Sequence, residues 1–165
     1  MSILKVNTIQ DKGGNTIISS DGAGNLTQSF AANTPAFRAR LSSNQSVSGS
    51  TWTVLSLATE DFDIGSYFDT STYRWTPPSG RYVINGQVRL STGMSYMYVA
   101  IYKNGTTEQV MAQIDASNAG IQNISGIIEP NGTDYYDLRC YLASSGTIAA
   151  GYGFTFMGGY KIIGA

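Results

Sequence analysis

From Pro35 onward, short runs of β-forming residues alternate with clusters of turn residues, and this spacing constrains the fold more than any other feature. The runs Arg81 to Leu90 and Tyr96 to Lys103 are two examples, and Asn104-Gly105 closes the second with a strong hairpin signal. No window longer than ten residues keeps the 3.6-residue apolar period of an amphipathic helix. Eight to ten strands at this spacing predict an all-β sandwich or barrel.

The first 34 residues differ from the rest and predict a separate segment. Two short strands, at 3–9 and 16–18, flank the turn cluster 11–15, which predicts a β-hairpin with a linker at 28–34. A two-stranded hairpin is marginally stable in water by itself. We therefore expect residues 1–34 to attach to another chain or protein, and residues 35–165 to form the main domain.

Composition excludes several classes of function. The chain has no histidine and one cysteine, Cys140, which excludes His-dependent catalysis, imidazole zinc sites and an intrachain disulfide. The net charge is −1 with 10 Lys and Arg, which argues against nucleic-acid binding. No apolar run approaches the ~20 residues of a membrane-spanning helix, and residues 1–12 lack a basic segment followed by an apolar stretch. We expect no membrane insertion, no secretory signal and synthesis in the cytoplasm.

The strands carry more aromatic side chains than one sandwich core can use. In the penultimate strand, period-two alternation puts Tyr136, Leu138, Cys140 and Leu142 on one face, which we assign to the core. Tyr135, Asp137, Arg139 and Tyr141 share the other face. These are either ordinary surface tyrosines or side chains buried between identical chains, because oligomer interfaces favour Tyr, Phe and Arg.

Four carboxylates crowd one segment: Glu60, Asp61, Asp63 and Asp69. A pair of them could serve as acid and base in glycoside hydrolysis, and the three aspartates could bind calcium. The alternative is that all four are solvated loop charges, since their spacing matches no regular ligand pattern. We name no catalytic, cofactor-binding or metal-ligating residue and expect no cofactor.

Residues 68–84 carry a recognisable pattern: an aromatic-Asp pair, a turn, a second aromatic, then Pro-x-x-Gly-x-Tyr and an apolar strand. It resembles the globular head of complement's first component, in the tumour-necrosis-factor superfamily. Further matches follow in order over about residues 35–163: Lys103-Asn104-Gly105, Ser125-Gly126 with Gly132-x-Asp134, and Phe156 before the glycines 158 and 159. The chain departs from the pattern at Tyr73, where the family often has glycine, in a shorter spacing from Trp75 to Pro77, and in lacking the family's occasional cysteines.

This resemblance implies a ten-stranded jelly-roll sandwich that assembles as a compact homotrimer around an aromatic-lined axis. Phe156 is the residue expected at the axis, with Tyr98 or Tyr102 nearby. Together with residues of the penultimate strand, the candidate trimer interface comprises Phe156, Tyr98, Tyr102, Tyr135, Arg139 and Tyr141.

The stretch Ser2 to Asp11 and the Gly-Asn turns after it resemble the opening of tail-fibre and virion proteins of tailed phages. This resemblance implies a non-enzymatic homotrimer in the virion, as a tail fibre, head fibre or decoration. Residues 1–34 would join other virion proteins, and the distal knob would bind a host surface glycan or protein through polar loops at 42–50, 91–95 and 115–122. The alternatives are a soluble β-sandwich carbohydrate-binding module, a polysaccharide depolymerase and a cytokine-like ligand.

Overall fold

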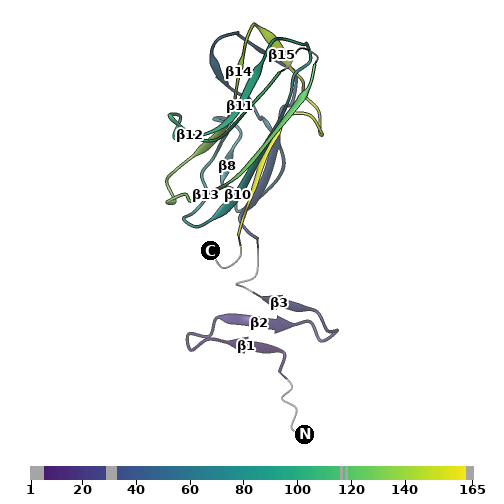
Figure 1. The fold of residues 1–165 in the computed structure, drawn as a ribbon. Coiled ribbons are helices and arrows are strands. Elements are labelled where there is room, and N and C mark those ends of the chain that lie inside the picture. Colours follow the sequence, from purple (N-terminus) through teal and green to yellow (C-terminus); the bar gives the residue numbers. More distant parts are fainter. Residues whose placement is uncertain (1–5, 29–32, 116, 118, 163–165) are drawn as a thin grey trace.

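The described residues fold into two β-sheets packed face to face, with two smaller sheets, one of which lies at the N-terminus (Figure 1). The computed structural model describes residues 6–28, 33–115, 117 and 119–162, which hold sixteen β-strands. Sheet I has the order β13-β10-β16-β4-β7 and sheet II the order β12-β11-β14-β9-β8, with β6 paired to β14. The prediction of an all-β sandwich is confirmed, and the two sheets contain eleven strands, five in sheet I and six in sheet II.

The bounds of the strands follow the predicted runs closely in the centre of each sheet. Sheet I contains β4 (Ala36–Arg40), β7 (Thr59–Ile64), β10 (Tyr82–Arg89), β13 (Ile121–Ile128) and β16 (Phe156–Lys161). Sheet II contains β6 (Trp52–Val54), β8 (Phe68–Asp69), β9 (Arg74–Trp75), β11 (Met97–Lys103), β12 (Thr107–Ile114) and β14 (Tyr136–Leu142). A two-stranded sheet pairs β5 (Gln45–Val47) with β15 (Gly146–Ile148).

Aromatic side chains of the 68–84 pattern meet in the core between the sheets. Trp75 and Tyr82 are fully buried, and their ring centroids lie 5.3 Å apart. Phe37 of β4 stacks on Trp75 at 4.5 Å and on Phe68 at 5.2 Å. Gly159 is required here, because a Cβ at that position would lie 3.0 Å from the Trp75 ring. The pattern is therefore a packing motif that joins sheet I to sheet II.

The turn between β8 and β9 is held by Asp69. Its carboxylate accepts hydrogen bonds from the backbone N–H and hydroxyl of Ser71 and from the hydroxyl of Thr72. These bonds lower the pKa of Asp69 to about 2. Tyr73 has a φ of 62°, in the left-handed region that favours glycine. Tyr73 stands where the resembled family often has glycine, and the backbone there adopts the left-handed conformation that glycine favours.

The Lys-Asn-Gly and Gly-x-Asp motifs contact each other across sheet II. Asp134 is 4% exposed, and its carboxylate pairs with Lys103 Nζ at 2.8 Å and accepts a hydrogen bond from Asn104 Nδ2 at 2.9 Å. The hydrogen bond from Lys103 is the main cause that lowers the pKa of Asp134. Two segments 30 residues apart are joined by this buried contact.

The N-terminal sheet has three strands rather than the two of the predicted hairpin: β1 (Thr8–Gln10), β2 (Thr16–Ser20) and β3 (Leu26–Gln28). Its two turns repeat one motif ten residues apart. The carboxylate of Asp11 accepts hydrogen bonds from the backbone N–H and the side-chain amide of Asn15, and the carboxylate of Asp21 accepts the same two bonds from Asn25. Residues 1–5 and 29–32 of the predicted attachment segment lie outside the described residues.

Two local predictions were wrong. The polar loop predicted at 42–50 contains β5, whose partner β15 lies a hundred residues away and gives no local signal. The last strand, predicted from the run Tyr152 to Ile163, begins at Phe156, because residues 151–154 form a turn in which the Phe154 N–H donates to the Gly151 carbonyl. The acidic segment from Glu60, for which the sequence left a loop or a strand edge open, lies mostly on the edge strand β7.

Candidate interaction surfaces

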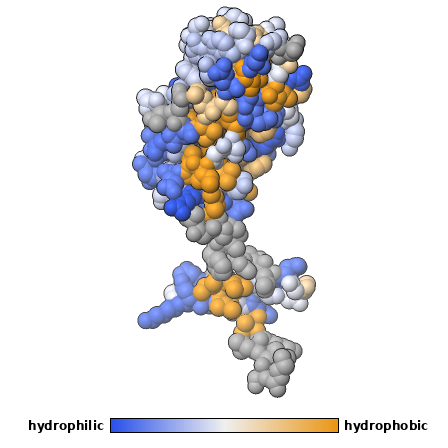
Figure 2. All heavy atoms as spheres, in the orientation of Figure 1, coloured by the Kyte–Doolittle hydropathy of each residue, from blue (hydrophilic) through white to orange (hydrophobic). Residues whose placement is uncertain are grey.

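A row of five apolar side chains crosses the entire outward face of sheet I. Cross-strand pairing places them in one line, from edge to edge: Ile127, Val83, Tyr160, Ala36 and Ile64. Ile127 is 68% exposed, Ile64 53% and Tyr160 41%. Figure 2 shows apolar surface gathered on one side of the sandwich, bordered by polar surface. The inward side chains of the same strands fill the core, and none of these five residues belongs to the core cluster of the described chain. We call it the apolar row.

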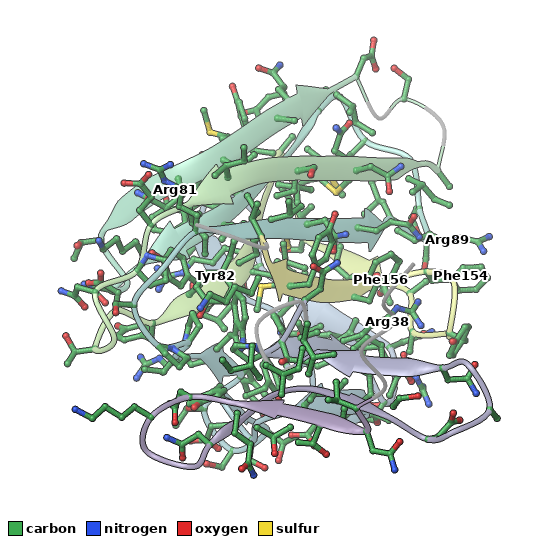
Figure 3. The ribbon with its side chains drawn as sticks, turned by 90° about the horizontal axis from the view of Figure 1, so that it is seen from below. Arg38, Arg81, Tyr82, Arg89, Phe154 and Phe156 are labelled. Atoms are coloured by element: carbon green, nitrogen blue, oxygen red, sulfur yellow. The ribbon has the colours of Figure 1, made fainter. Side chains whose placement is uncertain are left out.

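The next two rows of sheet I are more polar and surround Phe156. They contain Asn85, Arg38 and Phe62 in one line, then Gln87, Phe156 and Arg40 in the other. Two shallow hollows of about 310 and 280 Å³ flank Phe156. The guanidinium of Arg38 lies 4.3 Å from the centroids of both Phe156 and Tyr152. Figure 3 shows Phe156, Phe154, Arg38 and Arg89 on the same side of the sandwich.

Three of the four candidate carboxylates of residues 60–69 are held by protein groups. Asp61 pairs with Arg38 at 2.7 Å and with Arg40 at 2.8 Å, and its side chain is 11% exposed. Asp63 accepts a hydrogen bond from the backbone N–H of Phe68, and Asp69 holds the turn between β8 and β9. Glu60 is exposed on β7. Within the part of the chain that the structure describes, no three Cys, Asp or Glu side chains converge to hold a metal ion. The side chains of Asp61, Asp63 and Asp69 are thus engaged in structural contacts.

The outward face of sheet II carries a cluster of aromatic side chains. Trp52, Tyr141 and Tyr98 lie in one cross-strand line over β6, β14 and β11. With Tyr96 and Met111 they line a hollow of about 290 Å³, which we call the aromatic hollow. Beside it, Arg139 is paired with the buried Asp137 at 2.5 Å and stacks over Tyr102. Bonding to Asp137 raises the pKa of Arg139, which therefore stays charged.

The six residues predicted for the trimer interface divide between two surfaces. Phe156 lies on the outward face of sheet I, whereas Tyr98, Tyr102, Tyr135, Arg139 and Tyr141 belong to sheet II or its edge. Within one chain, Phe156 and the pair Tyr98 and Tyr102 lie on opposite sides of the core, so their meeting near a trimer axis stays a prediction about neighbouring chains. Tyr102 is also 7% exposed and Tyr135 lies under the Arg74 guanidinium, 4.0 Å from its ring centroid.

Sequence reasoning missed the residues of the apolar row. Ile127 and Val83 each occupy the outward positions of strands that were correctly predicted, so alternation gave a usable signal. What the sequence lacks is the register that aligns them with Ile64 and Tyr160 on strands distant in the chain. The core face of β14 was assigned correctly, and Cys140 is fully buried there, which raises the pKa of its thiol to about 12.

Among the described residues, there is no helix with the length and apolar character needed to span a membrane. No family model matches the sequence, and no curated protein matches it either. Several solved structures share its fold. Murine APRIL aligns at 14% identity with a TM-score of 0.64, over 77% of this chain and 98% of APRIL.

Two further structures extend the comparison. The Eiger tumour necrosis factor from S. frugiperda aligns at 11% identity with a TM-score of 0.62, over 79% of this chain and 93% of Eiger. The globular domain of zebrafish complement 1qA protein aligns at 12% identity with a TM-score of 0.56, over 78% of this chain and 98% of that domain. This chain therefore has the jelly-roll fold of tumour necrosis factors and complement C1q heads.

Proposed function

We propose that this chain is a non-enzymatic structural protein of a phage virion, a tail fibre, head fibre or decoration. In this proposal the jelly roll assembles as a homotrimer, residues 1–34 join it to other virion proteins, and the distal knob binds the surface of the host cell. The observation that carries the proposal is the apolar row on sheet I.

The apolar row favours burial against copies of the same chain. Complete burial of an Ile or Phe side chain contributes about 1.5–3 kcal/mol relative to exposure. Ile127 and Ile64 of the row, and Phe62 of the line beside it, keep between 47% and 68% of their surface exposed in the single chain. Covering these side chains with a second surface would stabilise the association by much of this free energy. Contiguous exposed apolar surface commonly marks an interaction site.

The position of the row is compatible with a three-fold ring. Such a ring joins two different surface patches, one on each neighbouring protomer, and closes when the rotation returns to the start. The row reaches both edges of sheet I, with Ile127 on β13 and Ile64 on β7. In the proposed trimer one end of the row packs against the other end of its neighbour's row. The middle of the row, at Tyr160 and Ala36, then lies nearest the axis.

The N-terminal sheet supports an attachment role for residues 1–34. Its strands have three to five residues, and Val6 and Ile9 are 49% and 48% exposed. A sheet of this size gains little from burial within itself. Packing against another virion protein, or against the same sheet of sister chains, would cover these side chains. The phage-like start of the sequence makes the virion the proposed setting.

The proposal is tested with the purified full-length chain. Light scattering should give three times the 17.7 kDa chain mass, and labelled protein should bind host bacteria saturably and compete with adsorption of the phage. A monomeric mass would contradict the trimer. A trimer that neither binds host cells nor competes with adsorption of the phage would contradict the virion role. Saturable sugar binding by a monomer would instead favour the carbohydrate-binding module, and release of reducing sugar would favour the depolymerase.

A further inference from the structure

The aromatic hollow on sheet II lies on the face opposite the apolar row and has a different chemical character. Its base is the cross-strand line of Trp52, Tyr141 and Tyr98, which pair directly in the register of β6, β14 and β11. Tyr96 and Met111 complete the lining. The apolar row presents mainly aliphatic side chains, whereas this hollow presents flat rings with polar atoms at their edges.

The rings are held in place by the sheet and by one another. The ring centroid of Tyr141 lies 5.8 Å from that of Trp52 and 5.9 Å from that of Tyr98, both in edge-to-face contact. Tyr96 contacts Tyr98 at 5.5 Å, and Trp52 also contacts Tyr102 at 5.3 Å. Because these contacts and the strand backbone fix the rings, a ligand would meet a surface that needs little ordering on binding.

The hollow carries no charge among its described lining side chains. The nearby guanidinium of Arg139 is turned to Asp137 and to the ring of Tyr102, so its charge is already compensated. An anionic ligand would find no counter-charge there. The volume of about 290 Å³ lies at the lower end of the ~300–1,000 Å³ range of ligand clefts, which fits a small neutral group.

We propose that the aromatic hollow binds a neutral saccharide. A sugar ring has a face of C–H groups, which packs on an aromatic ring, and a rim of hydroxyls, which pairs with tyrosine hydroxyls and the indole N–H. Trp52 supplies the largest ring and the three tyrosines supply the polar atoms. This inference rests on the proposed function that the knob binds a host surface. It assigns that binding to strands of sheet II, rather than to the polar loops favoured by the sequence.

Tryptophan fluorescence of the full-length chain reports on this site directly. The chain has two tryptophans, and Trp75 is fully buried in the core, so quenching by acrylamide measures access to Trp52. The probes are cellotriose, maltotriose, mannotriose, chitotriose, galactobiose and lactose, with sialyllactose as the charged counterpart of lactose. We expect at least one neutral probe to protect Trp52 saturably, and sialyllactose to bind no better than lactose.

Substitutions locate the binding, measured by calorimetry with the best probe. We expect Trp52→Ala and Tyr98→Ala each to weaken binding about tenfold or more, as for a central aromatic anchor. Tyr141→Phe keeps the ring and loses the hydroxyl, so it should weaken binding severalfold. Because the ring is kept, we expect this variant to fold even if the alanine variants do not. Tyr152→Ala is the matched control, because Tyr152 is 68% exposed and contacts Arg38 on sheet I.

The outcomes separate this inference from the proposed function. The saccharide site is overturned if Tyr152→Ala weakens sugar binding as much as Trp52→Ala does. It is also overturned if none of the neutral probes protects Trp52 from quenching. If Trp52→Ala abolishes cell binding while no sugar binds, the hollow recognises a protein and the saccharide inference is refuted, although the virion role stands. If sugars bind at the hollow but the wild-type chain binds no host cell, the inference stands and the proposed function fails.

Discussion

Replacing Ile127 with aspartate should dissociate the proposed trimer while leaving the jelly roll folded. Ile127 is 68% exposed in the single chain, and complete burial of an isoleucine contributes about 1.5–3 kcal/mol. Covering the exposed part is therefore worth about 1–2 kcal/mol per protomer. A trimer contains three such sites, so the substitution removes about 3–6 kcal/mol, a factor of about 10² to 10⁴ in the association constant.

The aspartate also places a charge where the trimer excludes water, so this range is a lower bound. Sedimentation equilibrium of the full-length chain measures the association constant, and circular dichroism measures whether each variant is folded. Met111→Asp is the matched control, because Met111 is 50% exposed but lies on the outward face of sheet II. A folded Ile127→Asp protein that associates as strongly as the wild type would refute the assignment of the apolar row. Equal weakening by Met111→Asp would also refute it.

Four further predictions concern the folded chain. Asp61→Asn should lower the free energy of unfolding by about 1–3 kcal/mol in urea titrations, because it leaves two guanidinium groups underpaired, whereas Glu129→Gln at an exposed ion pair should cost less than about 1 kcal/mol. Gly49→Ala should destabilise by about 1–3 kcal/mol, since its Cβ would lie 2.7 Å from backbone atoms that cannot move aside, and an unchanged melting temperature would contradict this. Asp69→Asn should be less stable than wild type at neutral pH. Because the pKa of Asp69 is about 2 and its ordinary value is 3.8, the difference should shrink as the pH falls from 3.8 toward 2. Cys140 should react with a thiol reagent only after unfolding, because burial raises its pKa to about 12; fast reaction of the native protein would show that the thiol is accessible.

The fold was predictable from local signals. Runs of β-forming residues identified β10, β11 and β14, and alternation identified the core face of β14, because side chains in a strand change sides at every residue. The 68–84 pattern identified the jelly roll, because its three aromatic residues serve one purpose, the packing of sheet I on sheet II. β5 was missed and β7 was left undecided between a loop and a strand edge, since polar or acidic residues occupy most of their positions and non-local pairing stabilises them.

The candidate surfaces were predictable only in part. Aromatic content indicated an interface, and this led to Tyr98 and Tyr141, which form one side of the aromatic hollow. The sequence does not state which sheet each outward face belongs to. Phe156 was therefore grouped with residues on the opposite side of the core. The apolar row depends on the alignment of Ile127, Val83 and Ile64 across five strands, which is a property of register and not of any one segment.

The most direct test is the mass of the full-length chain beside that of a truncated chain beginning at Pro35, both measured by light scattering at micromolar concentration. If the apolar row of sheet I drives assembly, both proteins should have three times their chain mass. A trimeric full-length chain with a monomeric truncated chain would move the association to residues 1–34. Monomers in both cases would contradict the trimeric knob and leave a single jelly-roll domain.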